Sequence, residues 1–66
     1  MQIKINGKDE HIETSADIAG FVQHKGLVAG KIVVEHNGRI VPHEEWAQVA
    51  LQEGDALEIV SFVGGG

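Results

Sequence analysis

The sequence predicts a small α+β domain in which one helix crosses a mixed sheet of about four to five strands. Three observations support this fold class. Asn-Gly occurs twice between strand-like segments, at Asn6-Gly7 and at Asn37-Gly38. A stretch with helical spacing of its apolar residues lies between these two turns. The chain closes with an apolar run over residues 56–63, rich in the β-branched residues that are typical of strands.

The first segment predicts an antiparallel hairpin. Ile3 and Ile5 alternate with polar residues within 1–5, and a second strand is expected over 8–12. Asn-Gly joins the two, and both residue types tolerate the positive φ angles of a type I′ turn. We therefore expect residues 1–5 and 8–12 to pair.

The next segment predicts a helix over residues 16–25. Ile18, Phe21 and Val22 have i, i+3, i+4 spacing, so they share one face and should cover the sheet. At the start of the helix, Thr14 and Ser15 are the expected capping residues.

The two ends of this helix carry further signals. Asp17 would place a negative charge in the first turn, where it suits the helix dipole. Gly26 is a natural residue to end the helix in a left-handed conformation, and Leu27 would fold back as the apolar contact of a Schellman motif.

The middle of the chain predicts a second hairpin. Residues 31–36 are β-branched and should form a strand, with Ile32 and Val34 facing the helix. A short partner strand is expected over 39–41. Pro42 ends it, because proline donates no backbone hydrogen bond.

A short helical turn is expected over residues 43–50, with Trp46 as its anchor. Residues 52–55 contain a Gly-Asp turn, and residues 56–63 form the last strand. Two hairpins around one crossing helix are the element order of the β-grasp fold. Residues 1–63 then make one domain, and residues 64–66 form a flexible tail.

Alternation in the last strand predicts a side of the sheet that the helix leaves uncovered. Glu58, Val60 and Phe62 share this side, while Leu57 and Ile59 face the other way. Exposed apolar residues in a patch often mark a protein contact. The alternative is that Phe62 packs under Trp46 or closes the edge of the core.

The tail Gly64-Gly65-Gly66 is the strongest functional signal in the chain. Glycine has no Cβ, so such a thread passes through gaps that exclude other residues. The Gly66 carboxylate, borne on this thread, can be offered to another protein as a reactant. A frayed terminus or an added linker gives the same composition.

Composition excludes several kinds of site and partner. Without cysteine there is no disulfide, thiolate zinc site or iron–sulfur cluster. A net charge of −5 with five Lys and Arg argues against nucleic acid as the main partner. The acidity serves either solubility or docking to a basic protein surface. No compact ligand spacing relates the four histidines His11, His24, His36 and His43.

A chain of 66 residues lacks the core volume of a self-contained enzyme. No apolar run approaches the ~20 residues that cross a bilayer, and the start lacks the features of a signal peptide. We therefore expect a cytoplasmic protein without a membrane partner.

Three segments resemble the sulfur carrier family of thiamine biosynthesis, ThiS, which is ubiquitin-like. They are VEHNGRIVP over residues 34–42, LQEGDALEIV over residues 51–60, and the ending FVGGG over residues 62–66. The Gly-Asp turn is shared with other small ubiquitin-like proteins. The terminal diglycine and the Asn-Gly-x-Ile-Val-Pro run are more specific.

The resemblance implies that this chain is a co-substrate rather than an enzyme. An ATP-dependent, ubiquitin-activating-like adenylyltransferase would adenylate the Gly66 carboxylate, with Gly65 as the first glycine of the motif and Gly64 as an extra tail residue. Conversion to a thiocarboxylate would then supply sulfur to thiazole synthase. ATP belongs to the partner, so the chain needs no cofactor of its own.

Three other functions remain open from the sequence. The small subunit of molybdopterin synthase uses the same tail chemistry, although its tail usually follows a proline-containing segment that is missing here. A ubiquitin-like modifier would instead form isopeptide conjugates. The third is a binding module with an incidental glycine tail.

Overall fold

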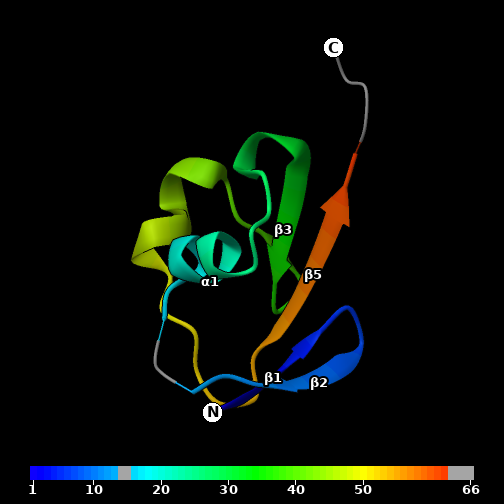
Figure 1. The fold of residues 1–66 in the computed structure, drawn as a ribbon, viewed down its shortest axis with the longest axis vertical. Coiled ribbons are helices and arrows are strands. Elements are labelled where there is room, and N and C mark those ends of the chain that lie inside the picture. The colour runs from blue at the N-terminus through cyan, green and yellow to red at the C-terminus, as the bar shows by residue number, and fades with distance from the viewer. Residues whose placement is uncertain (14–15, 63–66) are drawn as a thin grey trace.

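The structure, a computed structural model, describes residues 1–13 and 16–62. In this part of the chain a five-stranded sheet carries one α-helix and two 3-10 helices. The strands lie in the order β2-β1-β5-β3-β4, and the α-helix packs on one side of the sheet (Figure 1). The predicted α+β fold, with one helix crossing a mixed sheet, is confirmed.

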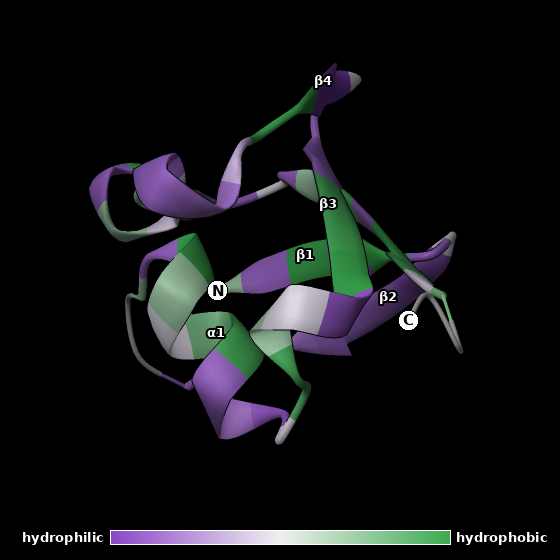
Figure 2. Ribbon diagram, turned by 90° about the horizontal axis from the view of Figure 1, so that it is seen from above, coloured by the Kyte–Doolittle hydropathy of each residue, from purple (hydrophilic) through white to green (hydrophobic). Residues whose placement is uncertain are grey.

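Strands β1 (Gln2–Ile5) and β2 (Lys8–His11) form the predicted antiparallel hairpin. In the turn, Asn6 has a φ of 51° and Gly7 a φ of 84°. Both values lie in the left-handed region that a type I′ turn requires. β2 is an edge strand and is hydrophilic along its length (Figure 2), which protects a sheet edge from pairing with other chains.

Strand β3 (Ile32–His36) follows a 3-10 helix, η1 (Ala29–Lys31), so it begins one residue later than the sequence predicts. It pairs with β4 (Arg39–Ile40) across a turn in which Asn37 and Gly38 have φ angles of 50° and 86°. The second Asn-Gly prediction is confirmed as well.

Strand β5 (Ala56–Ser61) is the central strand. It runs parallel to β1 and antiparallel to β3. The sequence predicts this strand through Val63, but the structure ends it at Ser61. The reason is that Ser61 lies opposite Ile32, the first residue of β3, so the paired strands end there, although the Phe62 N–H still donates to Lys31 O at 3.0 Å. Val63 lies outside the described residues.

Helix α1 (Ile18–His24) is shorter than the predicted 16–25 and has a different cap. Asp17 is the N-cap residue, and its Oδ1 accepts a hydrogen bond from the Gly20 N–H at 2.7 Å. A Cβ on residue 20 would lie 3.4 Å from the same oxygen, which is an ordinary contact, so the cap does not itself require glycine here.

Tertiary pairing explains why the helix starts late. Asp17 is extended and forms an isolated β-bridge with Ala50, which holds the chain out of helical geometry up to that residue. The prediction of Thr14 and Ser15 as caps is therefore wrong, since the cap lies further along the chain. Thr14 and Ser15 themselves lie outside the described residues.

The end of α1 forms the predicted Schellman motif. Gly26 has a φ of 73°. The Leu27 N–H donates to Val22 O at 3.2 Å, and the Gly26 N–H donates to Gln23 O at 3.0 Å. These two bonds satisfy carbonyls that a helix end otherwise leaves free. No helix in the described ranges has the length and apolar character needed to cross a membrane.

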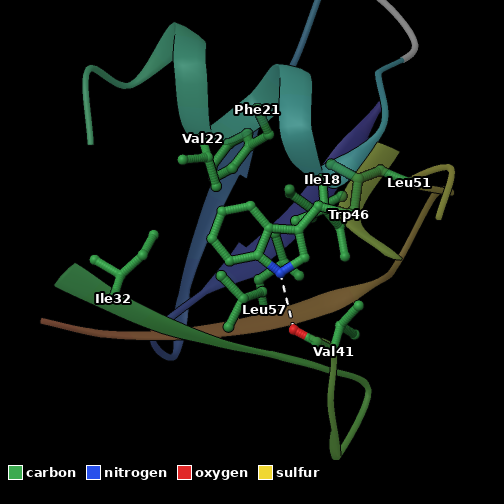
Figure 3. Close-up of a cluster of buried hydrophobic side chains, with 10 residues drawn as sticks. Ile18, Phe21, Val22, Ile32, Val41, Trp46, Leu51 and Leu57 are labelled. Atoms are coloured by element: carbon green, nitrogen blue, oxygen red, sulfur yellow. Dashed lines mark hydrogen bonds between the residues drawn. The ribbon is translucent and has the colours of Figure 1, made fainter. Parts of the chain in front are cut away.

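The hydrophobic core lies between α1 and the sheet (Figure 3). Its buried residues are Ile3, Ile18, Phe21, Val22, Ile32, Val34, Val41, Trp46, Leu51 and Leu57. Trp46 comes from the second 3-10 helix, η2 (His43–Gln48), and its Nε1 donates to Val41 O at 2.8 Å. The indole is thus fixed by a hydrogen bond as well as by packing, as its predicted role of anchor requires.

A buried carboxylate joins parts of the chain that are far apart in sequence. Asp55, 9% exposed, lies in the turn before β5. Its Oδ2 is 2.8 Å from His36 Nε2, and its Oδ1 accepts a hydrogen bond from Asn37 Nδ2 at 3.1 Å. The Gln52 N–H also donates to Oδ2, at 2.8 Å. Asp55 thus ties the β3–β4 hairpin to the start of β5.

Burial by itself raises the pKa of the Asp55 carboxyl, because the charged form loses its water. The hydrogen bonds from His36 and Asn37 contribute most to reversing this effect, and the pKa lies below its ordinary value of 3.8. The folded pKa is therefore lower than the unfolded one. The stabilisation is present above the unfolded pKa and is lost as the pH falls through the folded value.

We predict that Asp55→Asn lowers the free energy of unfolding at pH 7 by about 2 kcal/mol, because hydrogen bonds to a charged group are lost. Urea unfolding at pH 7 and pH 2 measures the effect. At pH 2 the difference in free energy of unfolding between the variant and the unmodified protein should shrink, because the Asp55 carboxyl of the unmodified protein takes up a proton as the pH falls. Asp9→Asn, an exposed control, should change little at either pH. A loss of equal size at both pH values would contradict the assignment.

Candidate functional site

The predicted reactive tail, Gly64, Gly65 and Gly66, lies outside the described residues. Its role therefore stays a prediction. What the structure describes is the body that carries this tail, up to Phe62. The tail follows β5, the central strand, so the body around the end of β5 is the candidate site.

Of the three residues predicted to bind a partner, Glu58 and Val60 lie within β5 and Phe62 follows its last residue. Val60 is 60% exposed and Phe62 44%, and Glu58 is exposed as well. Leu57, on the other side of the strand, is fully buried. The predicted alternation of β5 is thus confirmed, whereas the role of these residues in binding is not tested by it.

The alternative that Phe62 packs under Trp46 is wrong. Trp46 is 3% exposed and lies among the core residues beside α1 (Figure 3). Phe62 keeps 44% of its surface exposed and is not part of that cluster. The uncovered side of the sheet is a real surface of the described body.

This surface is wider than the sequence predicts. Val33 lies directly opposite Val60 on β3, and Glu35 lies directly opposite Glu58. Ile40 of β4 lies opposite Glu35 and is 63% exposed. We call the open face the set of residues Val33, Glu35, Ile40, Glu58, Val60 and Phe62.

The alternation of β3 could have revealed Val33 and Glu35. Once Ile32 and Val34 are assigned to the core, the odd positions must face the other way. Alternation could not have placed Ile40, because β4 is only two residues long. The side of the sheet on which Ile40 lies follows only from its pairing with Glu35 of β3.

The open face combines apolar area with two facing carboxylates. Directly opposite like charges on neighbouring strands are unfavourable. Neither Glu35 nor Glu58 takes part in the ion pairs formed between described residues. The pair is therefore a local negative charge that a basic group on another protein would relieve.

The four histidines do not come together at one site. His36 bonds to Asp55, and the His43 ring lies 4.7 Å from the Trp46 ring. His11 and His24 line a hollow of about 380 Å³ between β2 and α1. Among residues 1–13 and 16–62, no three His, Asp or Glu side chains are grouped so that they could hold a metal ion.

Comparison with protein families gives one match that spans the chain. The sequence model of the ThiS family matches residues 3–66. The sulfur carrier protein ThiS of Bacillus subtilis is 34% identical over 68 residues, which cover 97% of this chain and 98% of that protein. The likeness thus holds over the length of both.

A larger protein contains a similar segment. A thiazole synthase of Paramagnetospirillum magneticum is 41% identical over 66 residues, which cover 100% of this chain but 20% of that protein. The chain spans about a fifth of the length of this relative. The similarity therefore concerns one segment of it.

The fold has a solved counterpart. The crystal structure of a thiamine biosynthesis protein (ThiS) from Geobacter metallireducens superposes with a TM-score of 0.87 at 28% identity, and 100% of both chains is covered. The β-grasp architecture predicted from the element order is thereby confirmed.

Proposed function

The chain belongs to the ThiS family, and on that premise we propose that it is a sulfur carrier for thiazole formation in thiamine biosynthesis. One observation supports this most directly: the family match runs to Gly66, so the tail takes part in the likeness as well as the fold. The protein is a carrier and co-substrate rather than a catalyst.

The chemistry takes place at the Gly66 carboxylate. A C-terminal carboxylate is ionised at neutral pH, so one oxygen can attack the α-phosphate of ATP and release pyrophosphate. The acyl-adenylate that forms is a better electrophile than the carboxylate. Sulfur delivered at the oxidation level of hydrosulfide then attacks the carbonyl carbon, the bond to AMP breaks and a proton is lost, and the product is a thiocarboxylate.

The tail glycines suit this chemistry because the activating enzyme must enclose the reacting carboxylate. An acyl-adenylate hydrolyses in open water, so the activating enzyme must exclude solvent around it. A narrow channel achieves this, and a thread without side chains enters one readily. Three extended residues reach only about 10 Å. The folded body must therefore dock close to the mouth of the channel.

The open face is the docking surface in this proposal. Val60 and Phe62 lie next to the tail in sequence and are exposed in the described body. Val33 and Ile40 extend the apolar area across β3 and β4. The facing carboxylates Glu35 and Glu58 favour a partner surface with basic groups.

Two partners follow from the chemistry. The first is an adenylyltransferase that uses ATP, and the second is thiazole synthase, which receives the sulfur. The relative from Paramagnetospirillum magneticum supports the second, because a segment similar to this chain occurs there within a protein named thiazole synthase. A cytoplasmic location fits a carrier that serves two enzymes of small-molecule synthesis.

We predict that incubation with the activating enzyme, ATP and a sulfur donor changes the intact mass by one replacement of oxygen by sulfur. Fragmentation by mass spectrometry should place the change at Gly66. Omission of ATP is the control and should leave the mass unchanged. If a related carrier is modified under these conditions and this chain is not, the sulfur-carrier function is wrong.

We predict that one alanine added after Gly66 abolishes adenylation, because the reactive carboxylate moves and gains a side chain beside it. Pyrophosphate exchange by the activating enzyme measures this step. Thermal unfolding should match that of the unmodified protein, since the folded body is untouched. Normal exchange with the extended chain would mean that the tail is not the substrate.

We predict that Phe62→Asp weakens binding to the activating enzyme at least about tenfold, because an exposed aromatic side chain of the open face is replaced by a charge. Titration calorimetry without ATP isolates docking from chemistry. Val28→Asp is the matched control, since Val28 is 60% exposed but lies outside the open face. Equal affinities for Phe62→Asp and the control would remove the open face as the docking surface.

A further inference from the structure

The backbone of β5 has hydrogen-bonding groups that the sheet does not use. Along a strand, successive residues direct their N–H and C=O groups to opposite neighbours. The Asn6 N–H donates to Leu57 O at 2.8 Å, so Leu57 faces the β1 side. The Phe62 N–H donates to Lys31 O at 3.0 Å, so the backbone groups of Phe62 point toward β3. It follows that the backbone groups of Ile59 and Ser61, like those of Leu57, point toward the β1 side.

Strand β1 is too short to reach these residues. It ends at Ile5, and the chain turns away at Asn6. In its place the Asn6 side chain binds Ile59: Oδ1 accepts from the Ile59 N–H at 2.7 Å, and Nδ2 donates to Ile59 O at 3.2 Å. A carboxamide carries the same donor and acceptor as a peptide group. The backbone N–H and C=O of Ile59 are therefore already bonded, with the Asn6 carboxamide in the place that a peptide group of a neighbouring strand would take.

Ser61 is the next residue on this edge. It is exposed, and no described residue bonds to its backbone on the β1 side. Figure 1 shows β5 running on past the β1–β2 hairpin toward the C-terminus. Within residues 1–13 and 16–62, the Ser61 N–H donor and C=O acceptor on this side thus have no partner, three residues before the first tail glycine.

A hollow lies beside this free edge. It has a volume of about 290 Å³. Its apolar wall is formed by Ile5, Phe21, Leu27 and Ile59, and its polar rim includes Asn6 and the ion pair of Lys25 with Glu10. Ser61 lines it as well, on the helix side of the sheet. An added strand would direct alternate side chains toward the helix, so one of them would enter this hollow.

We propose that an extended segment of the activating enzyme pairs with β5 at Ser61 as an additional strand and places one apolar side chain in the hollow. This inference rests on the proposed function, since it assigns the partner that takes the tail. The pairing fixes the backbone direction at the last residue of β5. The tail is thereby aimed by main-chain hydrogen bonds, while the open face supplies contacts of side chains.

A second copy of this chain is a less suitable occupant. The free edge of β5 is short and ends three residues before the first tail glycine, so an enzyme that holds the tail must pass close to it. Two copies would each bring a net charge of −5 to the contact. The edge strand β2 consists of charged and polar residues, which oppose pairing with a second copy.

The test uses a matched pair of substitutions at residue 61. Ser61→Pro removes the free N–H, and proline is tolerated where the N–H faces away from the sheet. Ser61→Ala removes the hydroxyl but keeps the N–H. We expect Ser61→Pro to bind the activating enzyme at least about fivefold more weakly in calorimetry without ATP, and Ser61→Ala to bind as the unmodified chain does.

Equal affinities of Ser61→Pro and the unmodified chain would overturn the inference, as would equal weakening by Pro and Ala. If Ser61→Pro lowers the melting temperature, amide hydrogen exchange of the unmodified chain decides. Protection of the Ser61 amide on binding supports the added strand, and unchanged exchange refutes it.

The remaining outcomes distinguish failure of this inference from failure of the proposed sulfur-carrier function. Concentration-dependent dimers in sedimentation, abolished by Ser61→Pro, would assign the edge to a second copy and refute the proposed occupant. Failure of the sulfur-transfer assay alongside normal binding would count against the proposed function alone. Absence of any complex with the unmodified chain would refute both.

Discussion

The register of β5 is the constraint on which the other features of this molecule depend. As the central strand, β5 is held on one side by β1 and on the other by β3. Its pleat sends Leu57 into the core and Val60 outward. A shift of the pairing by one residue would turn the core-facing side chains of β5 toward solvent and the exposed ones toward the core. The pairing with two neighbours therefore determines both the core and the open face.

Local sequence chemistry predicts much of this fold. Both Asn-Gly turns, the apolar face of α1 and its Schellman end depend on residues within a few positions of one another. So does the alternation in β5. For such features the preferred φ angles and the period of the apolar residues are sufficient. In these parts of the molecule the structure is as predicted.

Features that depend on distant contacts escape this reasoning. The cap of α1 moves to Asp17 because Ala50 pairs with it. The end of β5 is set by where β3 begins. The bonds of Asp55 to the β3–β4 hairpin, and the exposure of Ile40, likewise need the pairing of separate segments. For the candidate site, the residues of β5 follow from alternation, while the contribution of β4 requires the assembled sheet.

The two turn asparagines have more than a turning role. Asn6 receives the Ile59 N–H at its Oδ1, and Asn37 receives the Ala56 N–H in the same way, at 2.8 Å. Each hairpin is thus fastened to β5 by a side chain as well as by its ladder. Detaching either hairpin alone would break both kinds of bond at once. The described body should accordingly open as one cooperative unit, with no separate exchange of a single hairpin ahead of global unfolding.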